Sequence, residues 1–341
     1  SLISTCSLEW RNYMCGIIGY SGQRKPLPIL LDGLSRLEYR GYDSAGIAII
    51  DGESLTIEKK EGKLQVLKDH LVDKEINGNI GIGHTRWATH GVPSDENAHP
   101  HYDNNQDFAI IHNGIIENYA EMKEVLLNEN YEFKSETDTE VVAVELSRQW
   151  TGNLLETVCN VAKGLEGTYA LVVTTIKDPE TIVAGRMMSP LVLGVGEDEV
   201  FLASDSAAIL EHTNKMIFLE NGDFVEIKNG QYQLFDIDMN EITREVQLID
   251  WEVSEAEKSG HDHFMYKEIL EQSEVIERTI TGRLELGSEQ IPIDLEHAKK
   301  FEKIWIVACG TAYHAGLFGK DLFEKVLGIP VSVELASEFR Y

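Results

Sequence analysis

The feature that most constrains the fold is a run of short apolar segments between residues 165 and 235, with little helical sequence between them. Strands that follow one another without crossover helices pair antiparallel, so this region predicts antiparallel sheets. The strands expected from the apolar pattern are 15–20, 45–50, 79–83, 107–112, 168–175, 181–185, 190–195, 199–203 and 223–227. Helical spacing is expected at 27–39, 116–128 and 139–150. The pattern favours an α+β domain of antiparallel sheets flanked by helices.

The C-terminal part follows a different pattern. The segment 232–259 is acidic and irregular, as a linker would be, and 263–284 has helical spacing. An apolar strand at 304–308 is followed by the loop 309–312, a helix to about Leu327 and a strand at 329–335. Strand, small-residue loop, helix and strand open a doubly wound α/β domain. The loop is either a tight turn or a phosphate site at a helix N-terminus.

Length, charge and cysteines narrow the class of protein. The chain has 341 residues, enough for about two domains. Its net charge of −28 argues against nucleic acid and against an anionic membrane surface. Four scattered cysteines form neither a disulfide framework nor a zinc pattern and suggest a reducing cytoplasm. No apolar run approaches the ~18 residues that would span a membrane.

Met14 and Cys15 stand immediately before the first expected strand. If translation begins at Met14 and that residue is removed, Cys15 carries both a thiol nucleophile and a free α-amine that can act as its base. The first thirteen residues lack the pattern of a secretory signal and are expected to be an artefact of the reading frame or a propeptide. The alternative is that Cys15 is an ordinary buried strand cysteine.

The loop that follows the strand near residue 83 is rich in polar side chains. Arg86 can form a two-pronged hydrogen bond with a carboxylate, and Thr89, His90 and His99 add hydrogen-bonding groups. The alternative is a loop held together by its own polar contacts. A metal site is disfavoured, because the spacing of the loop histidines matches no metal-binding motif.

Four further residues suggest roles in a site. Asn113 and Gly114 predict either a plain hairpin turn or an oxyanion hole made of a side-chain amide and a backbone N–H. Asp138, at a helix start marked by the capping pattern of Thr137 and Glu140, is either a helix-cap carboxylate or the counter-ion of a substrate ammonium. Together Arg86 and Asp138 would hold an α-amino acid at both ends. Arg40 either orients the loop around Cys15 or pairs with a nearby carboxylate.

Taken together, these segments resemble the glutamine–fructose-6-phosphate aminotransferase (isomerising) family, also called glucosamine-6-phosphate synthase. The matching segments are 14–19, 36–46, 83–91, 112–114, 135–140, 267–269 with Gln272, 281–283, 308–311 and 334–340. The resemblance runs from Met14 to Tyr341. It implies an N-terminal-nucleophile (Ntn) hydrolase sandwich of antiparallel sheets, followed by the beginning of a sugar-isomerase (SIS) domain. The implied parts are an extension at 1–14, a class II glutamine amidotransferase domain at 15–232, a linker and helical segment at 233–298, and a truncated start of the SIS domain at 299–341.

The resemblance also implies roles for these residues. Cys15 would attack the glutamine amide, with Asn113 and Gly114 stabilising the oxyanion. Arg86 and Asp138 would hold the substrate, and the remaining pocket residues would be Trp87, Thr89, His90, His99 and Arg40. Cys309, Gly310 and Thr311 would begin a sugar-phosphate site, although Ala312 stands where the family often has Ser. Ammonia would pass to fructose 6-phosphate to give glucosamine 6-phosphate.

The resemblance implies no metal and no cofactor, a cytoplasmic location, and a homodimer when full length. The family's catalytic residues for isomerisation lie beyond residue 341, so we expect an intact glutaminase domain with an incomplete isomerase half. Two alternatives stay open. One is another class II amidotransferase, of the phosphoribosyl-pyrophosphate, glutamate-synthase or asparagine-synthetase type. The other is a non-catalytic sugar-phosphate-binding regulatory protein.

Overall fold

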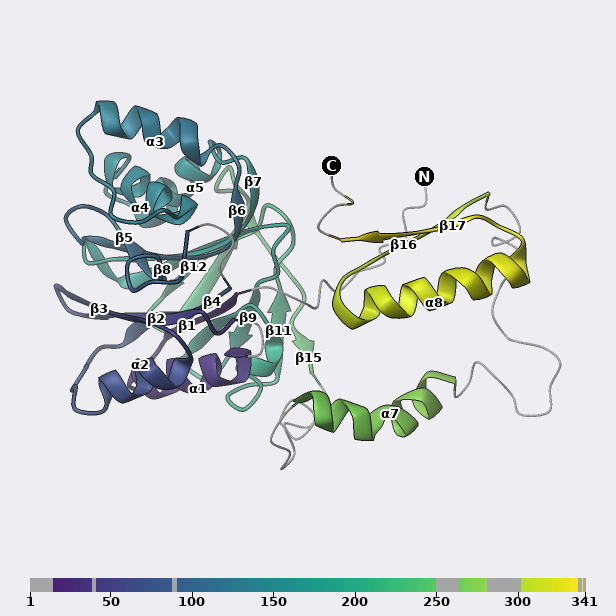
Figure 1. Ribbon diagram of the computed structural model, residues 1–341. Helices are drawn as coiled ribbons and strands as arrows, with labels where there is room; N and C mark the ends of the chain where they lie inside the picture. The colour runs from purple at the N-terminus through teal and green to yellow at the C-terminus, as the bar shows by residue number, and fades with distance from the viewer. Residues whose placement is uncertain are drawn as a thin grey trace. The chain divides into compact units, whose positions relative to one another are not determined.

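The structure, a computed structural model, describes residues 15–38, 41–87, 91–249, 264–280, 302–336 and 339. These residues belong to two compact units (Figure 1). The larger unit contains the described residues from 15 to 249, and the smaller unit contains those from 264 onward. No sheet includes described strands of both units, so each unit is described separately.

Two antiparallel sheets form the body of the larger unit. The first has the strand order β15-β11-β9-β10-β1-β4-β2-β3 and the second has the order β14-β13-β12-β8-β7-β6-β5. The strands of the first sheet are β1 (Gly16–Ser21), β2 (Ser44–Asp51), β3 (Ser54–Glu61), β4 (Ile80–Arg86), β9 (Val192–Val195), β10 (Val200–Ala203), β11 (Lys215–Phe218) and β15 (Gln247–Leu248). Those of the second are β5 (His101–Tyr102), β6 (Phe108–Ile116), β7 (Gly167–Thr175), β8 (Asp178–Met187), β12 (Phe224–Lys228), β13 (Gln231–Phe235) and β14 (Glu241–Ile242).

Helices cover the outer faces of the two sheets, which gives four layers (Figure 1). Apolar residues of both sheets, such as Ile17, Ile82 and Val172, share one buried cluster between them. The helices of the unit are α1 (Pro26–Leu37), α2 (Leu64–Leu71), α3 (Tyr119–Asn128), α4 (Asp138–Arg148) and α5 (Leu154–Ala162), with a short 3₁₀ turn η2 (Ser206–Ala208). α1 and α2 pack on the first sheet, while α4 and α5 pack on the second. The expected sandwich of antiparallel sheets flanked by helices is confirmed.

α4 begins where the capping pattern places it. Thr137 is the N-cap, and its hydroxyl accepts the Glu140 N–H at 3.4 Å. The Glu140 carboxylate reaches back to the N–H of Ser135 at 2.6 Å and so satisfies a donor ahead of the helix. This reciprocal capping fixes the direction in which α4 leaves the preceding loop.

The expected turn at Asn113 and Gly114 is wrong, because β6 continues through both residues to Ile116. The strand pairs with β7 over its whole length, with Asn113 opposite Ala170 and Gly114 opposite Tyr169. Gly114 has φ +132°, and a Cβ added there would lie 2.0 Å from the Thr168 carbonyl oxygen. Glycine is therefore required for close packing of two strands rather than for reversing the chain.

The larger unit also extends beyond the boundary expected at residue 232. β13 and β14 add to one edge of the second sheet. β15 pairs with β11 at the edge of the first sheet. Strands therefore occupy the beginning of the segment 233–298, which had been expected to be a linker and a helix.

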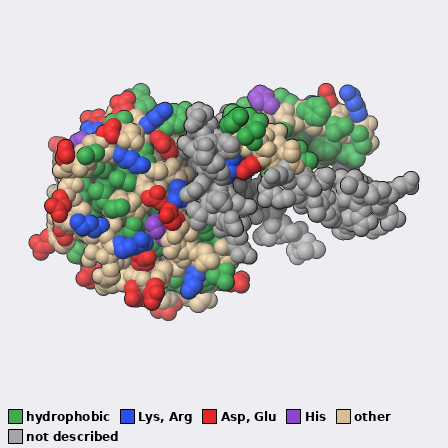
Figure 2. Space-filling model, turned by 90° about the horizontal axis from the view of Figure 1, so that it is seen from below, with side chains coloured by type: hydrophobic (Ala, Val, Ile, Leu, Met, Phe, Trp, Pro, Cys, Tyr) green, Lys and Arg blue, Asp and Glu red, His purple; other side chains and the backbone are tan. Residues whose placement is uncertain are grey.

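The described residues of the smaller unit form one parallel strand pair and two helices. β16 (Ile304–Ala308) pairs with β17 (Val331–Leu335), and α8 (Gly310–Leu327) connects them. This is the expected strand, loop, helix and strand, and α7 (Phe264–Ile280) lies within the expected helical segment. Hydrophobic side chains gather on the face of this unit seen in Figure 2. The described helices include none long and apolar enough to cross a membrane.

Candidate functional site

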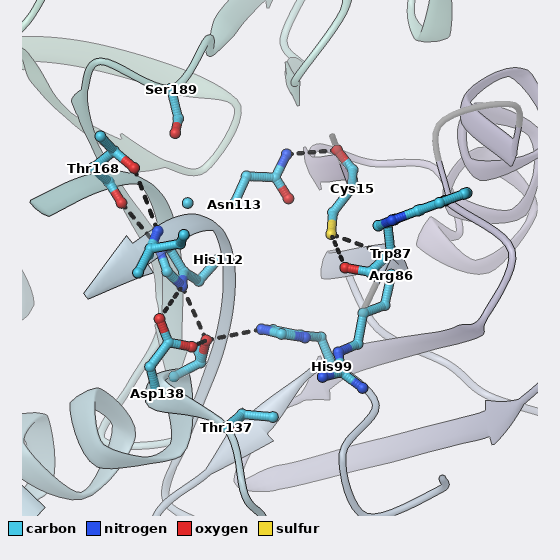
Figure 3. Close-up of a pocket in the computed structure, with 13 residues that line it drawn as sticks. Cys15, Arg86, Trp87, His99, His112, Asn113, Thr137, Asp138, Thr168 and Ser189 are labelled. Atoms are coloured by element: carbon cyan, nitrogen blue, oxygen red, sulfur yellow. Dashed lines mark hydrogen bonds and ion pairs between the residues drawn. The ribbon is translucent and has the colours of Figure 1, made fainter. Parts of the chain in front are cut away.

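A cavity of about 210 Å³ lies in the larger unit, where β1 starts, β4 ends and α4 starts. This volume is below the ~300 Å³ at which pockets for drug-sized ligands begin, so the cavity suits a small substrate. Figure 3 shows residues of both sheets facing the same space. The lining residues are Cys15, Arg86, Trp87, His99, His112, Asn113, Gly114, Ile115, Thr137, Asp138, Thr139, Thr168 and Ser189.

The Cys15 sulfur contacts the backbone of Trp87. Its Sγ accepts the Trp87 N–H at 3.1 Å and its thiol donates to the Trp87 carbonyl at 3.5 Å. Burial raises the pKa of the thiol to about 11, while the Trp87 N–H and the Arg86 charge oppose that shift. The sulfur is therefore a neutral thiol near pH 7 and needs a base in order to react. Within the described part of the chain, its hydrogen bonds go to backbone groups and not to a side-chain base.

Asn113 directs its amide nitrogen toward Cys15. Nδ2 donates to the Cys15 carbonyl oxygen at 2.6 Å (Figure 3). The Asn113 Oδ1 lies 3.0 Å from the His84 Nε2. A side-chain amide has two N–H groups. The second one is available for an oxygen that develops negative charge beside the sulfur.

Arg86 and Asp138 bring opposite charges to the cavity. Arg86 is only 3 % exposed, and its Nη2 donates to the Gly91 carbonyl at 3.3 Å. Burial lowers the pKa of the guanidinium, but an arginine stays charged in proteins. Asp138 is the first residue of α4, and its Oδ2 accepts the Ile116 N–H at 2.8 Å. The two groups match the carboxylate and ammonium of an amino acid.

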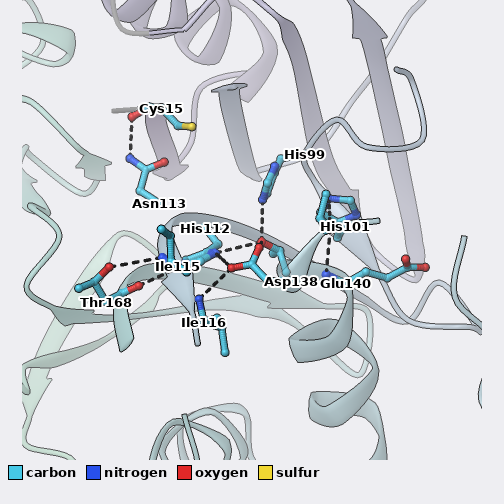
Figure 4. A network of polar contacts seen from close by, with 12 residues as sticks. Cys15, His99, His101, His112, Asn113, Ile115, Ile116, Asp138, Glu140 and Thr168 are labelled. Atoms are coloured by element: carbon cyan, nitrogen blue, oxygen red, sulfur yellow. Dashed lines mark hydrogen bonds and ion pairs between the residues drawn. The ribbon is translucent and has the colours of Figure 1, made fainter. Parts of the chain in front are cut away.

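Four buried histidines line or lie beside the cavity: His84, His99, His101 and His112. Thr139 Oγ1 lies 3.0 Å from the His99 Nε2 and 2.9 Å from the His112 Nδ1 (Figure 4). The rings of His84 and His99 stack at 4.2 Å. Burial lowers the pKa of His84 to about 3 and lowers the pKa values of His99 and His101 well below their ordinary range. The rings of His84, His99 and His101 are therefore neutral hydrogen-bonding groups near pH 7.

The described residues include no group of three or more His, Cys, Asp or Glu side chains arranged to hold a metal ion. The histidines instead contact hydroxyl, carbonyl and amide groups.

The structure brings most of the predicted site residues into one cavity. Those that line it are Cys15, Arg86, Trp87, His99, Asn113, Gly114 and Asp138. Arg40, Thr89 and His90 lie outside the described residues. Cys309, Gly310 and Thr311 belong to the smaller unit, where Cys309 is the N-cap of α8.

The sequence did not assign roles to several residues of the cavity, among them Thr168 and Ser189. Thr168 lies opposite Ile115 in the ladder between β6 and β7, and its hydroxyl is 3.3 Å from the Ile115 N–H. Ser189 follows the end of β8, with its carbonyl bound by the Arg186 Nε at 2.8 Å. Neither residue belongs to a recognisable motif, so only the strand register could have placed them.

Comparison with known proteins identifies a family and several relatives. Residues 68–259 match the family described as "Glutamine amidotransferase domain". A glutamine–fructose-6-phosphate aminotransferase (isomerising) of Clostridium tetani is 49% identical over 332 residues, which cover 96% of this chain and 55% of the relative. Relatives of the same name from Aquifex aeolicus and Thermus thermophilus are each 47% identical and also cover 96% of this chain. The chain spans about half the length of these relatives.

Solved structures show the same fold. The "allosteric regulatory enzyme of purine biosynthesis" aligns with 66% of this chain at 28% identity and a TM-score of 0.59. The glutamine phosphoribosylpyrophosphate amidotransferase of B. subtilis aligns with 94% of the chain at 22% identity and a TM-score of 0.60. At that identity the second similarity supports the fold alone.

The neutral histidines predict a specific dependence of stability on pH. The pKa values of His84, His99 and His101 are lowered in the folded state, so at acidic pH the unfolded chain binds more protons than the folded chain. The contribution is complete above pH ~6.5 and decreases as the pH falls below it. For His84 alone we expect a loss of about 2 kcal/mol in the free energy of unfolding at pH 5. Urea unfolding of the full chain at pH 7.5 and pH 5, followed by a signal from the larger unit, measures this loss.

A variant shows whether this dependence comes from the histidines. His101→Gln should reduce the difference between the two pH values, because one buried histidine is removed. His314→Gln, an exposed position of the smaller unit, serves as the control and should leave the difference unchanged. An equal difference in all three proteins would contradict the assignment.

Proposed function

The chain belongs to the glutamine amidotransferase family, and from this premise we propose that its larger unit hydrolyses the side-chain amide of glutamine with Cys15 as the nucleophile. The observation that carries this proposal is the single cavity shared by Cys15, Arg86, Asn113 and Asp138. It combines a nucleophile, an amide donor beside it and a pair of opposite charges. These are the groups that binding and attacking an amino acid amide require.

The proposed reaction begins with transfer of the thiol proton to the α-amine of Cys15, which is free when that residue begins the chain. The high pKa of the thiol and its purely backbone hydrogen bonds in the described structure support a base outside the side chains. The sulfur then bonds to the amide carbon, and the carbonyl oxygen becomes an anion. Asn113 Nδ2 and the backbone N–H of Gly114 would stabilise it. The amine proton passes to the leaving nitrogen as ammonia departs, and water hydrolyses the thioester to glutamate.

Substrate recognition is assigned to the charged pair. Arg86 would hold the α-carboxylate in a fork of two hydrogen bonds, and Asp138 would hold the α-ammonium. Trp87 and His99 would complete the wall, together with Thr89, His90 and Arg40 from the resemblance. Because both charges are largely buried, an amino acid that neutralises both is favoured over a ligand carrying one charge.

We also propose that the ammonia aminates fructose 6-phosphate to give glucosamine 6-phosphate. The names of relatives that share 47–49% identity over 96% of this chain support this acceptor. In the smaller unit, Cys309 caps α8 without a side-chain hydrogen bond, and Gly310 has φ +56°. First-turn N–H groups and the exposed Thr311 hydroxyl would then hold the sugar phosphate.

The alternatives have weaker support. A phosphoribosyl-pyrophosphate type amidotransferase is the printed name of one structural neighbour, but at 22% identity over 94% of the chain that similarity supports the fold alone. A non-catalytic regulatory protein has no need for a thiol, an arginine, an amide and a carboxylate in one cavity. A nucleophilic thiol must stay reduced, which supports a cytoplasmic location. A homodimer of the full-length protein is supported by the family resemblance alone.

The free amine gives the first prediction for the glutaminase. A chain that begins at Met14 and loses that Met should hydrolyse glutamine, because Cys15 then has a free amine. The chain with residues 1–14 attached should be slower by about 10²-fold or more, the scale of a general base. Cys15→Ala should abolish turnover but still bind glutamine. The rate of glutamate release from the two proteins tests this prediction. Equal rates for the chain that begins at Cys15 and the chain that retains residues 1–14 would refute the α-amine as the base.

The charged pair should control substrate affinity. Arg86→Lys keeps the charge but loses the fork, so we expect KM to rise about tenfold or more, in line with the ~1.5–3 kcal/mol of a charge-assisted hydrogen bond. Asp138→Asn should raise KM similarly, while its side-chain oxygen still accepts the Ile116 N–H. Steady-state kinetics in both variants provides the test. A fall in kcat with KM unchanged would place the residue in the transition state instead.

The smaller unit is tested by fructose 6-phosphate binding. Thr311→Val removes the hydroxyl at nearly constant shape and should weaken binding by about 3- to 10-fold, as expected for one hydrogen bond. Thr311→Ser retains a hydroxyl and is the matched control. Calorimetric titration of the three proteins measures the affinities. The same affinity for all of them would remove Thr311 from the proposed site.

A further inference from the structure

The Asn113 amide is held from two sides, and one of its partners comes from the opposite sheet. Asn113 lies on β6 and donates through Nδ2 to the Cys15 carbonyl at 2.6 Å. His84 lies on β4, and its Nε2 is 3.0 Å from Asn113 Oδ1 and 3.1 Å from the His112 carbonyl oxygen. One imidazole nitrogen thus bridges to two oxygens of β6.

These contacts fix the protonation of the ring. Both partners of the His84 Nε2 are acceptors, so Nε2 must carry the proton. The other nitrogen, Nδ1, is buried and has no hydrogen-bond partner among the described residues. A proton there would be an unsatisfied buried donor, so the neutral ring protonated on Nε2 is the stable form.

The same contacts select one orientation of the amide. With Oδ1 toward His84, Nδ2 faces Cys15 and the cavity. A flip of the amide would place Nδ2–H against Nε2–H, and Oδ1 against the Cys15 carbonyl oxygen. Both contacts would then be repulsive. Because Nε2 remains a donor, the His84 ring determines the orientation of the Asn113 amide.

The ring is itself held rigidly. His84 is fully buried on β4, opposite Ile17 of β1 and Gly46 of β2. Its face stacks on His99 at 4.2 Å with 29° between the planes. β1 and β4 also place Cys15 against Trp87. The nucleophile and the support of Asn113 therefore stand on the same strand pair.

Resting on the glutaminase function proposed above, we infer that His84 is a positioning residue that holds the Asn113 amide with its N–H groups toward Cys15 and the oxyanion. It touches neither the sulfur nor the substrate cavity, and it acts through Asn113. His84 belongs to the same sequence motif as Arg86. Its proposed role, however, depends on its contact with Asn113 in the second sheet and not on the loop that follows β4.

A double-mutant cycle on glutamine hydrolysis, with Cys15 at the N-terminus, tests this role. His84→Phe keeps an aromatic ring against His99 but removes the donor. We expect kcat to fall at least about tenfold and KM to change less than about threefold, because Arg86 and Asp138 are untouched. In an Asn113→Ala background the same substitution should change kcat less than about twofold, since no amide remains to be oriented.

A second substitution at position 84 separates the effect of the lost hydrogen bond on kcat from the effect of altered packing. His84→Gln can place an amide N–H near the position of Nε2 and should recover most of the lost kcat. If the Phe variant fails to fold, His84→Gln replaces it in the test. Its kcat should stay within about threefold of that of the protein with His84. An equal loss of kcat in both Asn113 backgrounds, or full activity in folded His84→Phe, would overturn the inference.

A measurement without turnover keeps the inference apart from the proposed function. In nitrogen-15 spectra of the folded Cys15→Ala protein, the Asn113 side-chain amide, identified by its loss in Asn113→Ala, should shift when His84→Phe is added. Glutamine affinity of the same protein should stay within about threefold. An unmoved amide resonance overturns the role of His84. Absence of both glutamine binding and hydrolysis in the unmodified chain overturns the proposed function instead.

Discussion

The antiparallel pairing of β1 with β4 is the constraint on which the site depends. The ladder sets Gly16 opposite Thr85 and Ile17 opposite His84. Cys15, one residue before β1, therefore meets Trp87, one residue after β4, and its sulfur accepts the Trp87 N–H. A Cβ at Gly16 would lie 2.6 Å from the Thr85 Oγ1 and 2.7 Å from the Leu37 Cβ, so a larger residue would push the strands apart. The register must be maintained, because a slip by one residue would turn every side chain of the strand to the other face of the sheet.

Burial between two sheets strengthens the electrostatic interactions of the polar groups in the cavity, but it also removes those groups from water, which is unfavourable. Arg86 and Asp138 are nearly inaccessible to solvent, and burial of charges is unfavourable unless partners compensate. The protein meets part of this demand with backbone groups, the Gly91 carbonyl for Arg86 and the Ile116 N–H for Asp138. In the proposed function a zwitterionic substrate would add contacts to both groups at once, and the low local dielectric constant would strengthen each contact.

Helix α4 connects recognition to the histidine cluster. Its cap is closed by Thr137 and Glu140, and its first residue is Asp138. Thr139 Oγ1, one residue later, contacts both His99 and His112. The helix start is therefore fixed by local capping and by the contacts of the Thr139 hydroxyl with two buried imidazole rings, so the Asp138 carboxylate has little freedom. Neutral histidines suit this place because each can donate with one nitrogen without adding charge to a buried site.

Local chemistry made several features predictable from sequence. The capping pattern at Thr137 gave the start of α4, and the apolar runs gave most strands of both sheets, because both depend on residues close together in the chain. The residue types at Cys15, Arg86, Asn113 and Asp138 indicated a nucleophile, an oxyanion donor and a charged pair, and the structure places all four around one cavity.

Long-range pairing decided the rest. Asn113 and Gly114 form a typical turn pair, yet the ladder with β7 holds them in a strand, because nine paired positions outweigh the local preference of two residues. The contact of His84 with Asn113 joins strands of different sheets, 29 residues apart, and no sequence spacing records which sheet faces which. The sequence thus determined which chemical groups are present and where most of the strands and helices lie. Only the packing of one sheet against the other decided which of those groups meet, because that packing depends on contacts between residues far apart in the chain.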